Sequence, residues 1–124
     1  MSSKEVPGRQ AVKNFFTLLF SGKLSKAEEA LKRIQKRYGL KESDGYYKAL
    51  YGIYYAYISD DRDSFLFHLW KRYLAGEKKE ELKAKFKDLL EKAYSPPEDF
   101  IQAWLDLISM MDSLPTPHKF EKSS

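Results

Sequence analysis

The chain has 124 residues, a formal net charge of +4 and no cysteine. Its length suits one domain that can bury a core of its own. The absence of cysteine excludes disulfides, a thiol nucleophile and thiolate ligands for a metal. No apolar run approaches the roughly 20 residues of a membrane-spanning helix, so no membrane partner is expected.

The beginning of the chain combines basic residues with a short apolar run at 15–20. This run is shorter than the apolar core of a secretory signal peptide, and a helix start follows it. We therefore expect a cytoplasmic protein. The composition is rich in Lys, Glu and Tyr and poor in Asn and Gln, which is typical of proteins from thermophiles.

The first third of the chain predicts two helices. Residues 1–8 are expected to form a flexible N-terminus before a helix over 9–21. A strongly amphipathic helix follows over 25–38, where Ser25 and Glu28 have the spacing of a capping box. Glycines suited to a helix C-terminus follow the first, second and fourth predicted helices: Gly22, Gly39 and Gly76.

An aromatic-rich region, 46–74, forms the middle of the chain and holds more than half of the aromatic residues. Its first helix, over 44–59, is apolar around most of its circumference, which predicts a central helix capped by Ser43 or Asp44. Because Gly inside a helix costs about 1 kcal/mol relative to Ala, Gly52 predicts a closely packed neighbouring helix. A further helix follows the acidic turn at 60–63.

The last third predicts a helix over 77–94 and another that opens at 95–98 and stops at the prolines of 115–117. Residues 115–124 are expected to form a polar C-terminal tail. Nothing alternates with period two, so no strand is expected. We predict a single all-α domain over 9–114, with six helices in three antiparallel hairpins, because short connections favour antiparallel neighbours.

The three hairpins begin close to a 34-residue period, which is the spacing of tetratricopeptide repeats. Gly22, Leu24, Ala27, Leu31 and Ile34 resemble the second-helix pattern of such a repeat, and Tyr94, Phe100, Ala103, Leu107, Met110 and Pro115 resemble another copy. Leu50, Gly52 and Tyr55 are similar to first-helix positions. The resemblance implies a right-handed stack with a concave groove for a peptide or partner protein. The alternative is a compact irregular bundle.

Chemistry-bearing motifs are absent from the sequence. It contains no P-loop, zinc-protease, dinucleotide-binding or nucleophile-elbow motif. Of the two histidines, His68 is expected on the polar side of its helix and His118 in the tail, and no carboxylate is spaced to partner either. We therefore expect no enzyme, no cofactor and no metal site.

The tyrosines give the first functional hypothesis. Tyr47, Tyr51, Tyr54 and Tyr55 cannot easily share one dry core, and Tyr suits interfaces because it joins an apolar ring to a polar tip. The sequence therefore predicts a small interaction module that binds a protein or peptide partner, or itself as a homodimer, through a Tyr-rich surface. The alternative is a Tyr-rich edge of the core.

The charge distribution gives the second functional hypothesis. Residues 1–43 carry ten Lys and Arg against four Glu, whereas 77–124 carry eight against ten acids. A basic stripe on the second helix could bind nucleic-acid phosphates without sequence preference. The alternative is an ordinary solvated face. The cations of the stripe are Lys26, Lys32, Arg33, Lys36 and Arg37.

Overall fold

The fold consists of α-helices joined by short turns. The computed structural model describes residues 7–94 and 97–120, which hold six α-helices, two 3-10 helices and no strand. The α-helices are α1 (Arg9–Phe20), α2 (Leu24–Arg37), α3 (Gly45–Ile58), α4 (Phe65–Leu74), α5 (Lys79–Tyr94) and α6 (Glu98–Met110). The 3-10 helices are η1 (Met111–Ser113) and η2 (His118–Phe120). The predicted all-α fold with six helices is confirmed.

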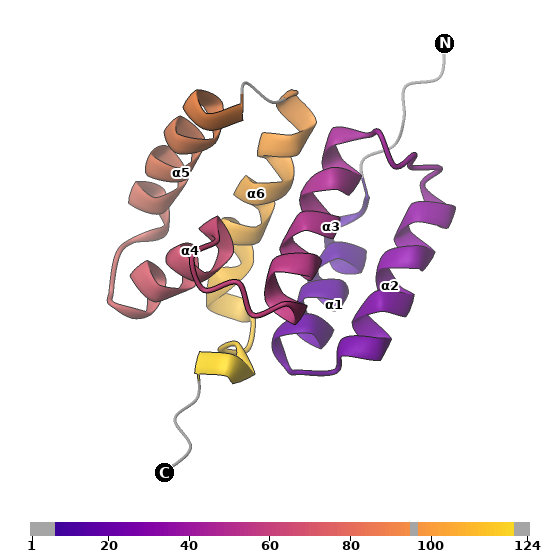
Figure 1. Cartoon of the computed structure of the whole chain (residues 1–124), viewed down its shortest axis with the longest axis horizontal. Helices are drawn as coiled ribbons and strands as arrows, with labels where there is room; N and C mark the ends of the chain where they lie inside the picture. Colours follow the sequence, from indigo (N-terminus) through magenta and orange to yellow (C-terminus); the bar gives the residue numbers. More distant parts are fainter. Residues whose placement is uncertain (1–6, 95–96, 121–124) are drawn as a thin grey trace.

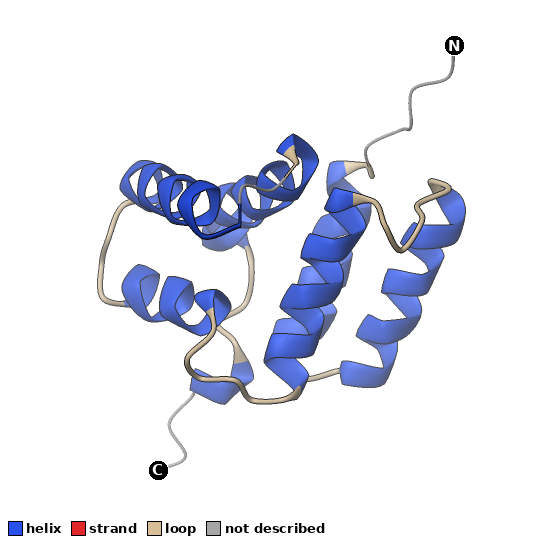
Figure 2. Cartoon of the chain, turned by 45° about the horizontal axis from the view of Figure 1, so that its top comes forward, coloured by secondary structure: helices blue, strands red, loops and turns tan. Residues whose placement is uncertain are grey.

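Helix α3 lies at the centre of the arrangement, as its apolar circumference predicts (Figure 1). Helices α1 and α2 pack as sequence neighbours on one side of it, and α4, α5 and α6 lie on the other. Figure 2 shows the same division from another direction. The main partner of α3 is α6 rather than α4, so the predicted middle hairpin is not confirmed as a packing unit.

The contact between α1 and α6 bears on the repeat interpretation. In a repeat stack, each hairpin contacts only the hairpins next to it. Here the first and the last α-helix touch, which closes the arrangement into a bundle. The tetratricopeptide-like stack is therefore not confirmed, and the contacts favour the compact bundle.

Two side chains of α6 hold the N-terminus of α3 and so define the seam between these helices. The backbone N–H of Tyr46 donates to Oδ2 of Asp99 over 3.1 Å, and the Tyr46 hydroxyl donates to Oδ2 of Asp106 over 2.8 Å. The first N–H groups of a helix lack partners within the helix. Asp99 therefore caps α3 from the first turn of α6, whereas the side chain of Asp44, a predicted cap, makes no cap hydrogen bond.

The α3–α6 seam also depends on a glycine. A Cβ atom at Gly45 would lie 2.2 Å from Oδ1 of Asp99 and 2.9 Å from Cγ of Pro97, so any larger residue there would displace these side chains. At Gly52, by contrast, a Cβ would meet no described atom within 4 Å. The close packing predicted at Gly52 is wrong. The glycine of α3 that has close neighbours is Gly45, at the start of the helix.

Two other predicted helix starts need correction. Helix α2 begins one residue before Ser25, with Lys23 as its N-cap residue and no side-chain cap, so the capping box does not form. Helix α6 begins at Glu98 after the N-cap residue Pro97, and 95–96 lie outside the described residues.

The end of the described chain packs against the bundle. The ring of Phe120 lies 5.5 Å from that of Phe67 in α4, and Pro117 is buried. Nδ1 of His118 lies 2.7 Å from the hydroxyl of the fully buried Tyr57 at the end of α3. The expectation of a polar tail does not hold for these residues, because their apolar side chains and His118 fasten them to α3 and α4.

The core is formed by apolar and aromatic side chains. Among the described residues no charged side chain is buried. Trp70 in α4 and Trp104 in α6 are buried with indole Nε1 atoms that have no hydrogen-bond partner in the described part of the chain. A buried donor without a partner costs about 1–3 kcal/mol, so both indoles are retained for the apolar contacts of their rings.

Candidate interaction surfaces

Three tyrosines form a stacked row on the exposed face of α3, which we call the tyrosine ladder: Tyr47, Tyr51 and Tyr55. Tyr51 and Tyr55 expose 47% and 56% of their surfaces, and Tyr47 is half-buried. The ring centroids are 6.2 Å apart between Tyr47 and Tyr51 and 6.3 Å apart between Tyr51 and Tyr55. Residues four apart lie above one another on a helix, so the rings form one continuous aromatic strip.

Tyr54, the fourth predicted contact residue, belongs to the core instead. It exposes only 8% of its surface and lies on the edge of α3 that faces α2. Burial, followed by the nearby carboxylate of Glu28, raises its pKa above 10.0. Burial and then Glu42 raise the pKa of Tyr47 in the same direction. Both hydroxyls therefore stay protonated at neutral pH and can donate hydrogen bonds.

A hollow of about 380 Å³ lies on the other edge of the exposed face of α3. Gly52 and Ala56 line it from α3, and Phe100 and Trp104 line it from α6. The missing side chain at Gly52 leaves this hollow open. The exposed face of α3 thus carries an aromatic strip beside a small recess, whose lining also includes Asp61 and Asp63.

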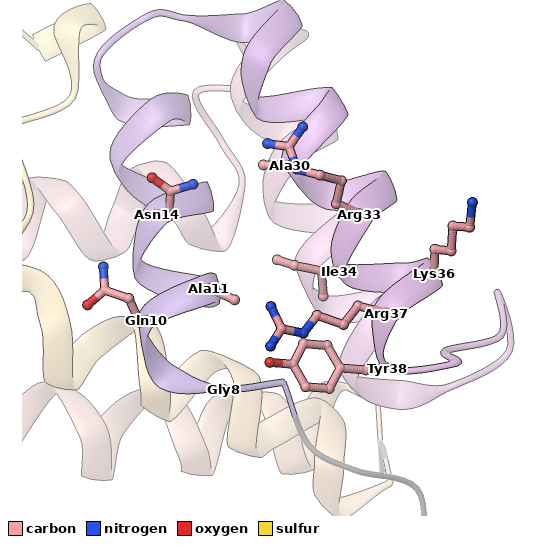
Figure 3. A pocket seen from close by; sticks show the side chains of 10 residues that line it. All are labelled: Gly8, Gln10, Ala11, Asn14, Ala30, Arg33, Ile34, Lys36, Arg37 and Tyr38. Atoms are coloured by element: carbon pink, nitrogen blue, oxygen red, sulfur yellow. The ribbon is translucent and has the colours of Figure 1, made fainter.

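The five predicted phosphate-binding cations of α2 are all exposed, but only three of them line the same cleft among the described residues. Arg33 and Arg37 line a groove between α1 and α2, with their guanidinium groups directed toward α1 (Figure 3). Lys36 also lines this groove, but its ammonium group points away from α1. Lys32 lies 3.9 Å from Glu28, which partly offsets its charge. Lys26 is exposed and lines no part of the groove.

This α1–α2 groove has a volume of about 710 Å³ and combines apolar and polar walls. Ala11, Ala30, Ile34 and the ring of Tyr38 supply apolar surface, and Gln10 and Asn14 supply amides from α1. The Arg37 guanidinium lies 5.6 Å from the centroid of the Tyr38 ring, a cation–π distance that helps to hold it. None of the described residues that line the groove carries a carboxylate.

The surroundings of the α1–α2 groove are also poor in acids. Residues 7–27 contain no Asp or Glu, and they include Arg9, Lys13, Lys23 and Lys26. Within the described ranges, no carboxylate lies within ion-pair distance of Arg33 or Arg37. These two arginines therefore make no ion pair within the described ranges, and the nearest acids along α2 are Glu28 and Glu29.

The acidic end of the molecule has the opposite arrangement. Three carboxylates of α6 and η1 are held by internal partners: Asp99 by Tyr46, Asp106 by Tyr46 and Gln102, and Asp112 by Lys79. The Lys79 ammonium, 3.1 Å away, lowers the pKa of Asp112 below 3.8. Among the described residues, these three acids are thus paired within the fold, whereas Arg33 and Arg37 make no ion pair.

The sequence did not predict the α1 wall of the groove. Gln10 and Asn14 stand four residues apart on the exposed side of α1, and Ala11 lies beside them. A row of uncharged amides on a helix flanked by cations was the available signal. Whether these amides line a groove depends on which face of α2 lies opposite them, and the sequence of α1 does not show this.

Within the described chain, no three His, Asp or Glu side chains gather closely enough to hold a metal ion. None of the helices in the same ranges combines the length and the apolarity that a membrane span needs. His68 lies exposed on α4. The chain matches no protein-family model, no curated protein and no solved structure.

Proposed function

We propose that this chain is a small protein-interaction module that binds a partner protein, or a second copy of itself, through the tyrosine ladder of α3. The observation that supports this proposal is the continuous stack of Tyr47, Tyr51 and Tyr55 on an exposed helix face. Single exposed apolar residues are normal, whereas a contiguous patch of them is typical of an interaction site. Tyr is also enriched among residues that dominate binding energy.

Binding would bury the flat rings and use their hydroxyls for orientation. Tyr side chains have few rotatable bonds, so ordering them costs little entropy. Stacking holds the rings of Tyr51 and Tyr55 beside each other before a partner arrives, which lowers this cost further. The recess at Gly52 could receive an apolar side chain of the partner next to the ladder.

The first experiment measures self-association by sedimentation equilibrium over a wide concentration range. The test variant is Tyr51→Gln with Tyr55→Gln, which keeps the helix and removes both exposed rings. The matched control is Leu74→Gln with Leu89→Gln, because these leucines expose 44% and 41% of their surfaces on other helices. A dimer that the tyrosine variant loses and the leucine variant keeps would support a homodimer through the ladder.

A monomer directs the test to other proteins. A photo-crosslinking amino acid at position 55 is compared in the host cell with the same group at position 89. We expect a discrete adduct from position 55 that Tyr51→Gln removes. Equal adduct patterns from both positions, together with a monomeric protein, would contradict the proposal.

Nucleic-acid binding is the second candidate, supported by the unpaired Arg33 and Arg37 and by the acid-free stretch 7–27. The pairing of Lys32 with Glu28 and the outward direction of the Lys36 ammonium weigh against a continuous phosphate-binding track. Binding to mixed duplex DNA and RNA at two salt concentrations tests it. Affinity that falls steeply with salt and disappears in Arg33→Glu with Arg37→Glu would favour this candidate.

A further inference from the structure

We propose that the α1–α2 groove binds an acidic peptide segment of a partner protein, with apolar side chains on the groove floor and carboxylates on Arg33 and Arg37. This site is separate from the tyrosine ladder and does not depend on it. The proposal rests on the shape and lining of the groove, the spacing of the arginines, and the lack of a carboxylate partner for either of them among residues 7–94 and 97–120.

The floor of the groove suits apolar side chains. Ala11 and Ala30 are small, so the helices leave room between them above Ile34. The volume of about 710 Å³ lies in the range of about 300–1,000 Å³ that is typical of ligand-binding clefts. Two or three apolar side chains of the peptide can therefore be buried there, away from water. This burial contributes about 25 cal/mol of binding free energy for each Å² of apolar surface.

The arginines give the groove its preference for acids. Arg33 and Arg37 are one turn apart, which separates their positions by about 6 Å along the helix. In an extended peptide, residues i and i+2 are separated by about 6.6 Å and point to the same side. A peptide that alternates apolar and acidic residues can therefore place its apolar side chains on the floor and its carboxylates at the rim. The guanidinium fork matches a carboxylate with two parallel hydrogen bonds.

The opposite wall suits a peptide backbone. Gln10 and Asn14 line the groove from α1, and Figure 3 shows Ala11 on the side of α1 nearer the arginines and Gln10 farther from them. A side-chain amide both donates and accepts hydrogen bonds, so it can pair with the N–H and C=O groups of an extended chain. The two walls thus offer different chemistry, one for main-chain groups and one for carboxylates.

The lining favours a peptide over nucleic acid and over a second copy of this chain. Phosphate binding needs rows of cations and no apolar floor, whereas here the floor is apolar and Lys32 is paired with Glu28. The acidic helix α6 of a second copy would be a poor occupant, because Asp99 and Asp106 are already bound to Tyr46. A partner with uncommitted carboxylates is the better match.

Fluorescence anisotropy with a labelled seven-residue peptide of alternating Leu and Asp, blocked at both ends, tests the proposal. The comparison probes are the same peptide with Asn in place of Asp, a seven-residue polyglutamate, and a 20-base-pair DNA duplex. We expect the Leu/Asp peptide to bind at least about tenfold more tightly than either peptide control, because only it uses both floor and arginines. Polyglutamate or duplex DNA binding as tightly as the Leu/Asp peptide would overturn the proposal.

Two variants locate the binding, and a third serves as their control. Arg33→Gln with Arg37→Gln should lower the affinity for the Leu/Asp peptide by about tenfold or more. Asn14→Glu should weaken it similarly, because it adds a competing carboxylate to the groove from an exposed position. The control Lys32→Gln with Lys41→Gln removes the same charge from exposed positions outside the groove and should change affinity less than twofold.

Other results of the same experiment overturn the proposal. If the lysine control weakens the peptide as much as the arginine variant, net charge rather than the groove governs binding. No binding of the Leu/Asp peptide at millimolar concentration also overturns it. The variant Tyr51→Gln with Tyr55→Gln should bind the peptide normally, so failure of the groove and failure of the ladder can be distinguished.

Discussion

The α3–α6 seam and the α1–α2 groove are the two most extensive helix contacts of the molecule, and they are built in opposite ways. At the seam, Gly45 allows close approach, and the carboxylates of Asp99 and Asp106 are bound across it. At the groove, the small side chains of Ala11 and Ala30 leave a cleft along the contact, and Arg33 and Arg37 have no carboxylate partner in the described part of the chain.

This difference shows what charged residues do in each region. Charges that cross the seam hold two helices together, so removing them should reduce stability. Charges that line the groove hold nothing within the described fold, so removing them should leave stability unchanged. A count of acids and bases along the sequence does not distinguish these two uses.

The largest expected effect comes from Gly45→Ala, which prevents the close approach of α3 and α6. The new Cβ would collide with Asp99 and Pro97, so the start of α6 must move and the cap on the Tyr46 N–H is lost. We expect a loss of about 3 kcal/mol in the free energy of unfolding, measured by urea denaturation. A loss below about 0.5 kcal/mol would show that the seam is loose.

Tyr46→Phe should have the next largest effect. It removes the hydroxyl that donates to Asp106 over 2.8 Å and keeps the buried ring. A hydrogen bond to a charged group contributes about 1.5–3 kcal/mol, so we expect a loss of about 2 kcal/mol by the same measurement. An unchanged stability would mean that Asp106 finds an equal partner in water.

The same variant predicts a pH dependence. Burial first, and then Asp106 as hydrogen-bond acceptor and as a nearby charge, raise the pKa of Tyr46 far above 10.0. The folded state therefore keeps this proton above pH 10.0, where the unfolded state releases it, and stability falls as pH rises. The stability difference between wild type and Tyr46→Phe should shrink by about 1.4 kcal/mol per pH unit above that value. A constant difference up to pH 11 would contradict this assignment.

Gly52→Ala should act in the opposite direction to Gly45→Ala, although both residues are in α3. A Cβ at position 52 meets no described atom within 4 Å, so the substitution only improves helix propensity. We expect a gain of about 1 kcal/mol in thermal or urea unfolding. Destabilisation would show that a side chain at position 52 meets a neighbour closer than 4 Å.

The smallest effect is expected at the groove. Arg33→Gln with Arg37→Gln should change the free energy of unfolding by less than about 0.5 kcal/mol, as is usual for exposed substitutions. Circular dichroism during urea denaturation measures it. A loss above about 1 kcal/mol would mean that the arginines serve the fold, and the contrast with the seam would fail.

Helix positions could be predicted because they depend on local patterns. Periodic apolar residues and terminal glycines such as Gly22 and Gly39, both at positive φ, locate helices whatever their neighbours are. The pairing of α3 with α6 could not be predicted, because Asp99, the cap of α3, stands 53 residues away from Tyr46. The prediction at Gly52 was wrong for the same reason, since a single glycine in a sequence does not show whether another helix packs against it.

The tyrosines show where the prediction of sites stops. Tyr54 and Tyr55 are adjacent, yet one exposes 8% of its surface and the other 56%. Helix α3 is apolar around most of its circumference, so its pattern does not say which edge meets α2. The η2 segment was missed for a different reason, because three residues ending in Phe120 are too few to show a period.

The fluorescence of the two buried indoles can report the unfolding of the protein without an added label. Indole fluorescence shifts to longer wavelength when water or polar groups surround the ring, and Nε1 of both Trp70 and Trp104 lies in apolar surroundings without a partner among the described residues. Unfolding should therefore shift the emission strongly to the red. With Trp70 replaced by Phe, the remaining signal comes from α6 and follows the seam, while the reverse substitution follows α4. Two helices on the same side of α3 can thus be followed separately as they unfold in an otherwise unlabelled chain.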